Sequence, residues 1–435
     1  MTNEDIEQVE QIEQEEQSKR SFSIFHGDIT LWIVYFLFCV ISIVEVFSAL
    51  SMLTYAKGEF FSDITKHIFY LTIGFLIALI THNIPCRWFK YVGTILWIIS
   101  TIFLVVVLLL PNNEVNGAQR TFEIFGFNIQ PSEFAKGAVV LVVAFILSFM
   151  QTNDGADRRT MKYILWITLI PTALILKENF STAAILLAVV FLMMFIGRIP
   201  FDQLGKLIGV IVLLGGLLLG FCACFPEKAK DYGLDRGTTW VTRLTDFKGQ
   251  NDGDTTKVAE EPNAQVLHAN IAIASSNVIG KMPGNSVERD FLPQAFSDYI
   301  YAIIVEELGL AGGVFVIFLY VVILFRAAKI AKRCERSFPA FAVLGLALLI
   351  CIQALAHICV NVGLAPVTGQ PLPLISRGGS SIIVTSFYFG VMLSVSRFAK
   401  KKGNIQPVEE VPFEIISGDT IMVNEEEFTN DKGID

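Results

Sequence analysis

The residues best suited to catalysis lie in a stretch that changes from polar to apolar, FLPQAFSDYIYAIIVEELGLAGG at residues 291–313. Asp298 stands where the polar part ends, and Glu306 and Glu307 follow about two helical turns later, roughly 12 Å along a helix. Carboxylates at the edge of a long apolar segment are costly to bury, so they indicate a functional site. The ordinary alternative is that Asp298 caps a helix and that the two glutamates face water.

The reaction that a carboxylate such as Asp298 performs most readily is proton abstraction. Held against a hydroxyl group, it acts as a general base and contributes roughly 10²- to 10⁴-fold to the rate. The start of a helix favours the ionised form that a base requires, because the helix dipole is positive there. Ser297 is placed to cap that helix and Pro293 restricts the preceding backbone, so Asp298 is expected to face a cavity.

A second polar stretch precedes another apolar run, NGAQRTFEIFGFNIQPSEFAKG at residues 116–137. Pro131 favours a helix start, which places Glu133 and Lys136 on one helix face at i, i+3. Arg120 and Lys136 are cations that could offset the charge of a phosphate group. The alternative is that Glu133 and Lys136 form only an ion pair at the end of a helix.

A third stretch, PVTGQPLPLISRGGSS at residues 366–381, is rich in proline and glycine and contains Arg377. Its prolines exclude a continuous helix, and irregular backbone near membrane depth is tolerated only inside protein or beside a wet cavity. Five residues could present backbone N–H groups to an anion: Ser376, Gly378, Gly379, Ser380 and Ser381. The alternative is a tight loop that is needed only for packing.

Long apolar runs must position these three stretches. Of the 435 residues, 53% are hydrophobic and 17% are charged, a balance typical of a chain with many spans of about 20 apolar residues. The sequence therefore predicts an all-α integral membrane protein with about ten transmembrane helices. The expected spans are residues 29–53, 67–84, 91–110, 132–150, a fifth that ends at 176, then 181–196, 204–224, 299–325, 340–362 and 380–397.

Lysine and arginine residues are concentrated in alternate connections between these spans. By the positive-inside rule those connections are cytoplasmic, and with ten spans so are both tails. The expected organisation is an acidic cytoplasmic tail (1–28), a membrane domain (29–397), and a cytoplasmic tail (398–435). The cationic connections contain Lys19 and Arg20, Arg87 and Lys90, residues 158–162, Arg198 and Lys206, residues 326–336, and residues 400–402.

A large extracytoplasmic loop, residues 225–297, is expected between helices seven and eight. Its middle part, residues 248–262, is charged and contains glycine, so it is expected to be mobile. Residues 266–279 have helix-like apolar spacing and are expected to lie along the membrane surface. The residues expected to support the site around Asp298 are Glu306, Glu307, Gln265 and Pro293.

Several classes of protein and site are not supported. The net charge of −8 lies largely in the tails, and no basic patch with interleaved aromatics indicates nucleic-acid binding. The seven cysteines, most of them in apolar runs, do not form a disulfide framework. The acidic first 20 residues lack the pattern of a signal peptide. No ligand cluster demands a metal, although a divalent cation remains possible.

Together the three stretches resemble the three signatures of the shape, elongation, division and sporulation family: NGAQR…QPSEFAK, FLPQAFSDYIYAIIVEELG and PVTGQPLPLISRGGSS. The resemblance covers about residues 32–397. It implies a ten-helix membrane glycosyltransferase on the outer face of the bacterial cytoplasmic (inner) membrane. Such an enzyme polymerises lipid II, an undecaprenyl-pyrophosphate-linked disaccharide peptide, into peptidoglycan strands. It also implies a partner, a class B penicillin-binding protein that acts as transpeptidase.

By this resemblance, Asp298 matches the family's essential aspartate, and Arg120, Glu133 and Lys136 match the charged positions of the first signature. Residues 376–381 match the Gly-Gly-Ser signature. The chain departs from the family pattern at four positions: Gln294 where Glu is usual, Arg377 where Tyr is usual, His357 where Asn is usual, and Met282 where Gly is frequent.

The chemistry of lipid II suits these residues. Its sugar pyrophosphate is α-linked and the strand is β-linked, so inversion suggests one direct displacement with Asp298 as general base. The leaving pyrophosphate needs cations, and Arg120, Lys136 and Arg377 are on the expected outer face.

Other functions remain open from the sequence. A lipid II flippase would use a polar cavity with charges such as Glu45, Lys136 and His357. A non-enzymatic scaffold that recruits the transpeptidase would not need Asp298 at the mouth of a cavity. Within the family, long charged tails favour septal synthesis at cell division, with other division proteins as partners, over elongation.

Overall fold

The structure, a computed structural model, describes residues 26–57, 62–109, 114–115, 118–119, 122–124, 127–152, 155–231, 235–251, 261–292 and 294–399. Two of the residues singled out by the sequence, Arg120 and Pro293, lie outside the described residues. So do most of the two predicted tails and residues 252–260 of the stretch that is expected to be mobile.

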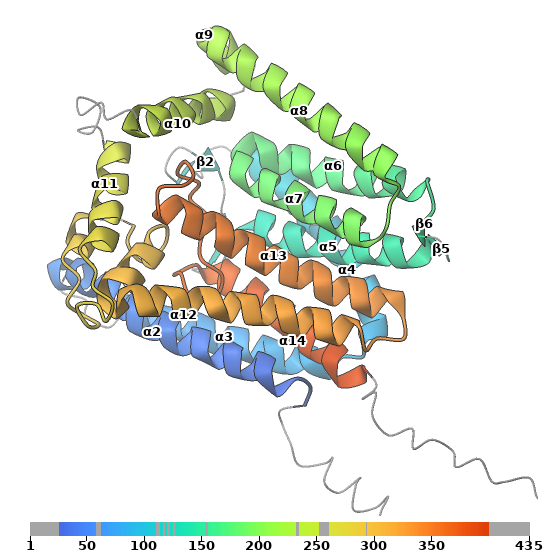
Figure 1. Cartoon of the computed structure of the whole chain (residues 1–435), viewed down its shortest axis with the longest axis horizontal. Coiled ribbons are helices and arrows are strands. Elements are labelled where there is room, and N and C mark those ends of the chain that lie inside the picture. Colours follow the sequence, from blue (N-terminus) through green and yellow to red (C-terminus); the bar gives the residue numbers. More distant parts are fainter. Residues whose placement is uncertain are drawn as a thin grey trace, which may run out of the picture. The chain divides into compact units, whose positions relative to one another are not determined.

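Ten long helices form the membrane part of the chain, and each coincides with a predicted span (Figure 1). They are α2 (Ile29–Lys57), α3 (Ser62–Asn83), α4 (Phe89–Leu109), α5 (Pro131–Phe149), α6 (Thr160–Glu178), α7 (Phe180–Ile196), α8 (Phe201–Cys224), α12 (Ile300–Ala331), α13 (Ser337–Asn361) and α14 (Gly379–Phe398). Nine of the described helices are long and apolar enough to cross a membrane, and α7, with 17 residues, is slightly shorter. The prediction of an all-α, multi-pass membrane protein is confirmed.

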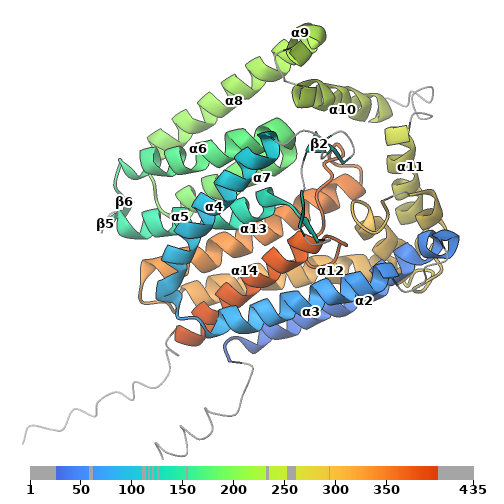
Figure 2. The same cartoon turned by 180° about the vertical axis from the view of Figure 1, so that it is seen from behind.

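Shorter elements connect these helices. Three two-stranded antiparallel ribbons are formed by β1 (Glu114–Val115) with β2 (Ala118–Gln119), β3 (Phe122–Ile124) with β4 (Phe127–Ile129), and β5 (Gln151–Thr152) with β6 (Gly155–Ala156). The long connection before α12 contains α9 (Pro226–Asp231), α10 (Asp235–Asn251), α11 (Glu261–Ala274) and the 3-10 turn η3 (Glu288–Phe291); a further 3-10 turn, η1 (Cys86–Trp88), precedes α4. Helix α11 runs across the ends of the long helices and includes residues 266–274 of the stretch with helix-like apolar spacing (Figures 1 and 2).

Helices α5 and α14 lie at the centre of the bundle, and α8 lies at its edge. The apolar windows of α5 and α14 are 72% and 78% buried, whereas that of α8 is 6% buried. Small residues allow the central helices to approach closely: a Cβ on Gly137 would lie 2.2 Å from the Tyr388 ring. Helix α8, by contrast, exposes most of its apolar side chains, and lipid or a partner can cover them.

The connections between helices gather at two opposite ends of the bundle. At one end, which we call the arginine end, Arg326 pairs with Asp28 (Nε to Oδ2, 3.0 Å), Arg397 bonds Asn83, and Arg158 pairs with Asp202. At the other end, which we call the Asp298 end, lie Asp298 and the stretch 363–378. The described connections that are rich in lysine and arginine thus share one end.

The helix that follows Asp298 is broken, which the sequence did not predict. Gly309 interrupts α12 with φ 75° and ψ −179°. The chain at 277–282 pairs with the break: Leu310 N donates to Asn277 O at 3.1 Å and Met282 N donates to Glu307 O at 2.8 Å. A Cβ on Gly309 would lie 2.3 Å from Val278 O, so this contact requires glycine.

Candidate active site

Asp298 is half-buried in a turn just before α12, and a neighbouring helix fixes its backbone. The Asp298 N–H donates to Gln294 O at 3.1 Å, and Asn361 of α13 donates from Nδ2 to Asp298 O at 3.0 Å. Asn361 Oδ1 also accepts from Ala302 N at 3.1 Å, so Asn361 supplies the cap that was expected from Ser297. The Ser297 hydroxyl instead donates to Asp298 Oδ1 at 3.1 Å.

The Gly/Pro-rich stretch lies directly against the Asp298 turn. The Ser376 hydroxyl donates to Ser297 O at 2.7 Å and accepts from Leu372 N at 2.7 Å. The Arg377 N–H donates to Phe296 O at 3.0 Å. The bonds to Ser297 and Phe296 join residues 79 and 81 positions apart and bring the first and third stretches described above, around Asp298 and Arg377, side by side.

The Arg377 side chain already has two partners in this structure. Its Nη2 pairs with Asp63 at the start of α3 (2.8 Å), and its guanidinium lies 5.2 Å from the centre of the Phe296 ring. Both charged side chains of the pair are 25% exposed, so water and ligands can still reach them. Asp63 was not among the residues predicted from the sequence, although an acidic residue opening an apolar helix is a visible signal.

The stretch around Glu133 contributes a buried cation, Lys136, and the hydrogen-bond network around it, beneath this turn. Lys136 Nζ donates to Glu133 Oε1 and to Gln353 Oε1 of α13, both at 2.8 Å, and Lys136 has no exposed surface. Gln353 Nε2 in turn donates to Pro371 O at 3.1 Å. The pair is therefore more than an ion pair at the end of a helix, since it reaches the Gly/Pro-rich stretch through Gln353.

Helix α13 carries a polar stripe of which only His357 was noted in the sequence. Gln353, His357 and Asn361 are four residues apart, so they share one helix face. His357 Nδ1 contacts Gln370 O at 2.7 Å, and because a carbonyl can only accept, this nitrogen carries the proton. The stripe thus holds Lys136, the 363–378 stretch and Asp298 in one arrangement. In the sequence, the signal for this stripe is a set of polar residues at i, i+4 and i+8 of an otherwise apolar helix.

The start of α14 holds the remaining residues of the Gly/Pro-rich stretch. Gly378 is the N-cap residue of α14, Ser380 Oγ accepts from Gln130 N at 3.3 Å, and a Cβ on Gly379 would lie 2.7 Å from the Tyr70 ring. Gly378 and Gly379 are half-buried, and Ser380 is buried. The glycines therefore allow the chain to pack closely at this turn. The backbone N–H groups of the turn lie at the Asp298 end.

The two glutamates after Asp298 do not face water, and that alternative is wrong. Both are fully buried. Glu306 pairs with Lys281 at 2.6 Å and accepts from the Ser286 hydroxyl. Glu307 accepts from Ser48 at 2.5 Å and from the backbone N–H groups of Gly284 and Ser286. These carboxylates hold the 277–289 loop against the broken helix and support the site through it.

The described structure adds a cation near Asp298. Arg243 of α10 donates from Nη1 to Val367 O at 2.6 Å. Arg243 therefore contributes positive potential here. Gln265 is half-buried on α11, which packs against α12.

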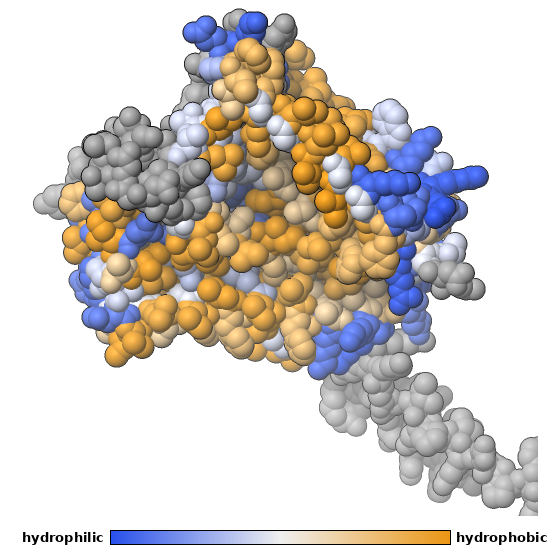
Figure 3. Space-filling model, turned by 45° about the horizontal axis from the view of Figure 1, so that its top comes forward, coloured by the Kyte–Doolittle hydropathy of each residue, from blue (hydrophilic) through white to orange (hydrophobic). Residues whose placement is uncertain are grey.

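The surface beside α8 is hollowed. Figure 3 shows a largely apolar face with a recess in its middle and hydrophilic residues visible at depth. An apolar rim around a polar interior suits a ligand that has an apolar chain and a polar head. No group of three or more His, Cys, Asp or Glu side chains among the described residues is placed to hold a metal ion.

Comparison with known proteins agrees with this architecture. The profile of the FtsW, RodA and SpoVE family, described as "Cell cycle protein", matches residues 28–401. A relative from Hahella chejuensis, "Probable peptidoglycan glycosyltransferase FtsW", is 30% identical over 347 residues, which cover 78% of this chain and 82% of that protein. "Stage V sporulation protein E" of Bacillus subtilis is 28% identical over 379 residues, covering 86% and 98%.

A solved structure shares the fold. A chain of a complex described as "Structural coordination of polymerization and crosslinking by a peptidoglycan synthase complex" aligns with a TM-score of 0.65 and 23% identity, over 86% of this chain and 99% of that chain. Since the family profile spans most of the sequence, from the start of α2 to just beyond α14, the chain belongs to the FtsW, RodA and SpoVE family of cell cycle proteins.

Proposed function

We propose that this chain is a peptidoglycan glycosyltransferase of the FtsW type, which polymerises lipid II during septal synthesis at cell division. The observation that carries the proposal is the half-buried Asp298 carboxylate, held where the three polar stretches converge. The activity in the name of the Hahella chejuensis relative supports it. The orientation that we propose places the arginine end in the cytoplasm and the Asp298 end outside, because lysine and arginine mark cytoplasmic connections.

In the proposed reaction, Asp298 acts as general base. A sugar hydroxyl attacks the anomeric carbon of the donor, the bond from that carbon to the pyrophosphate oxygen breaks, and the pyrophosphate leaves with the electron pair. The hydroxyl proton passes to the Asp298 carboxylate. A single displacement converts the α-linked donor into a β-linked product.

We assign charge compensation of the leaving pyrophosphate to the cations of the Asp298 end. Arg243 and Arg377 are half-buried there, and Arg120 is proposed to join them. Lys136 has no exposed surface, so its contact with a phosphate would require Gln353 and the attached 363–378 stretch to move. A divalent cation carried by the substrate phosphates would add to these charges.

We further propose a class B penicillin-binding protein as the partner, at the division septum with other division proteins. The structurally similar complex, described as coordinating polymerization with crosslinking, supports a transpeptidase partner. The exposed α8 offers apolar surface of the kind that a membrane-spanning partner helix can cover.

The direct experiment is strand synthesis from purified lipid II by the purified full-length protein, with and without the transpeptidase, followed by gel separation of labelled strands. Polymer is expected, and more of it with the partner. Movement of lipid II across vesicles without polymer would favour a flippase. Neither polymer nor movement, with the partner still bound, would favour a scaffold.

A further inference from the structure

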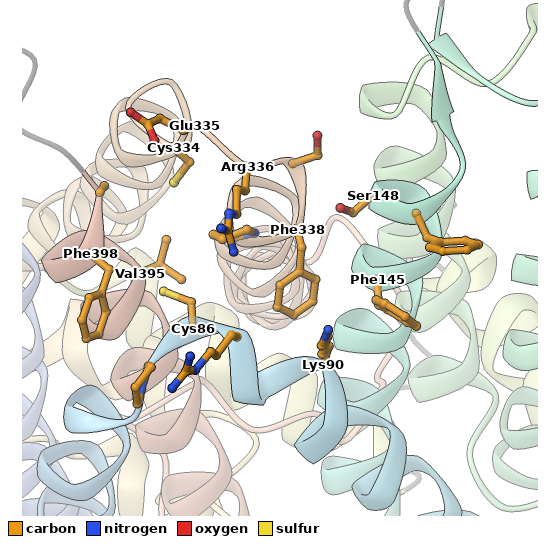
Figure 4. A pocket seen from close by; sticks show the side chains of 16 residues that line it. Cys86, Lys90, Phe145, Ser148, Cys334, Glu335, Arg336, Phe338, Val395 and Phe398 are labelled. Carbon is orange, nitrogen blue, oxygen red and sulfur yellow. The ribbon is translucent and has the colours of Figure 1, made fainter. Parts of the chain in front are cut away.

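A pocket lies at the arginine end, opposite to the Asp298 end. It has a volume of about 770 Å³ and is formed where α4 begins, α5 ends, α12 passes to α13, and α14 ends. Figure 4 shows Arg336, Phe338, Lys90 and Phe145 around this space. No residue of the proposed reaction lines it, so it calls for a separate explanation.

The charge of this pocket is strongly positive. Its lining includes three cations, Arg87, Lys90 and Arg336, and one carboxylate, Glu335. None of the three cations forms an ion pair within the described part of the chain, and Lys90 contacts only the Tyr91 ring, at 4.7 Å. At the same end, Arg326 pairs with Asp28 and Arg158 pairs with Asp202. Unpaired cations around a cavity favour an anionic occupant.

The first turn of α13 adds to this positive potential. Residues 336–339 line the pocket, and the N-cap residue of the helix, Arg336, makes no side-chain capping bond. The backbone N–H groups of Ser337 and Phe338, which open a 25-residue helix, therefore face the same region as the cations, and such groups bind phosphates well, although Pro339 carries no N–H.

The remaining walls are apolar and aromatic. Phe145, Phe149 and Phe338 line the pocket together with Val395 and Phe398. Just outside it, Trp88 and Tyr91 are 52% and 55% exposed, as aromatic residues are at the depth of lipid headgroups. A small soluble phosphate without an apolar part gains nothing from such walls, whereas a lipid places its phosphate and first chain carbons side by side.

We propose that this pocket binds the headgroup of an anionic phospholipid, with the phosphate between Arg87, Lys90 and Arg336 and the start of the acyl chains against the phenylalanines. In the proposed orientation the pocket faces the cytoplasmic leaflet, where basic clusters at helix ends meet anionic lipid.

The test is native mass spectrometry of the delipidated full-length protein in detergent, titrated with phosphatidylglycerol or phosphatidylcholine. We expect a preference for phosphatidylglycerol that the Arg87→Gln/Arg336→Gln double variant reduces about tenfold or more. The matched control, Lys162→Gln/Lys206→Gln, removes the same charge from exposed positions at the same end and should bind like the wild type. Equal effects of the two double variants, or no effect of either, would overturn the proposal.

A second variant keeps the test decisive if the pocket arginines are needed for folding. Ser148→Glu adds a carboxylate to the lining while all three cations remain, and it should weaken phosphatidylglycerol binding. Glycerol 1-phosphate serves as the soluble competitor. If it displaces phosphatidylglycerol at equal concentration, the pocket recognises a soluble phosphate compound and the lipid assignment is wrong.

Discussion

At the scale of single residues, Asp298 differs from the other carboxylates of its stretch. Glu306 and Glu307 are buried, and both oxygens of each already accept hydrogen bonds. Asp298 is half-buried, and the Ser297 hydroxyl donates to its Oδ1. Of these three carboxylates, only Asp298 has exposed surface that a substrate can reach.

Asp298→Asn is expected to abolish strand synthesis nearly completely while expression and partner binding stay normal, because the amide cannot accept the proton. Asp298→Glu should also lose roughly 10²-fold, since one methylene moves the base by about 1 Å. The control Asp290→Asn makes the same chemical change at an exposed position of the same segment and should leave the rate unchanged. Polymerisation of lipid II at the wild-type rate by Asp298→Asn would refute the assignment of the base.

Arg243→Gln tests the cations of the site separately from the base. A charged hydrogen bond is worth about 1.5–3 kcal/mol, so we expect strand synthesis to fall roughly tenfold or more. Arg158→Gln removes an arginine whose side chain is 72% exposed at the opposite end, and it should have little effect. Unchanged synthesis by Arg243→Gln would shift the phosphate contacts to Arg120, Arg377 and Lys136.

Met282 is one of the four departures from the family pattern, and its backbone conformation has a physical cost. The residue has φ 72°, a conformation that L side chains rarely adopt, at a position where the family frequently has glycine. Met282→Gly should raise the thermal unfolding midpoint, because it removes about 1–2 kcal/mol of backbone strain. Gly284, at φ 90° with open space around it, is the reciprocal control: Gly284→Ala should lower the midpoint. A lower midpoint for Met282→Gly would show that the side chain contributes more than the strain costs.

At the scale of elements, α13 organises the site. Its stripe of Gln353, His357 and Asn361 bonds the Gly/Pro-rich stretch, Lys136 and the Asp298 turn, while the rest of the helix packs in the bundle. A polar stripe inside an apolar helix is stable only because each member finds a partner. The geometry of the site therefore depends on this helix as much as on the loops.

Gln353 and Lys136 should be energetically coupled. Gln353→Leu removes one of the two acceptors of a fully buried ammonium and should lower the unfolding free energy by about 1.5–3 kcal/mol. In the Lys136→Met background the same change should cost at least about 1 kcal/mol less, measured as a double-mutant cycle by thermal unfolding in detergent. Gln203→Leu, which removes one surface hydrogen bond, is the control. Additive effects of the two changes would argue against the network.

At the scale of the whole molecule, the connections between helices lie at two ends of the bundle that differ in charge. The proposed active site lies at one of these ends. The lipid pocket occupies the other. By the positive-inside rule, the proposed donor chemistry is external and the proposed contact with anionic lipid is cytoplasmic.

Cysteine labelling in intact cells checks this orientation. Asn285→Cys, at an exposed position of the Asp298 end, should react with an impermeant thiol reagent, in a chain where the exposed Cys224 is replaced by serine. Lys162→Cys, at the arginine end, should react only after permeabilisation. The reverse pattern would place Asp298 in the cytoplasm and remove the basis for an external reaction.

The sequence by itself determined the class of fold and the identity of the family. Apolar runs long enough to span a membrane indicate burial in lipid directly, so all ten helices could be located. The family resemblance rested on three motifs in a fixed order. Asp298 could be singled out because a carboxylate beside an apolar run is a local signal. These features depend on composition and spacing along one segment, which the sequence shows without any folding.

Only the tertiary structure decided which polar residues meet. The break at Gly309 depends on a backbone pairing with residues 277–282, about 30 positions earlier, and nothing near Gly309 predicts it. The same holds for Glu306 and Glu307, which the loop takes out of water, and for Gln353, whose partners come from two other segments. Long-range hydrogen bonds between groups of ordinary type leave no periodic trace in the sequence, so only the folded chain reveals them.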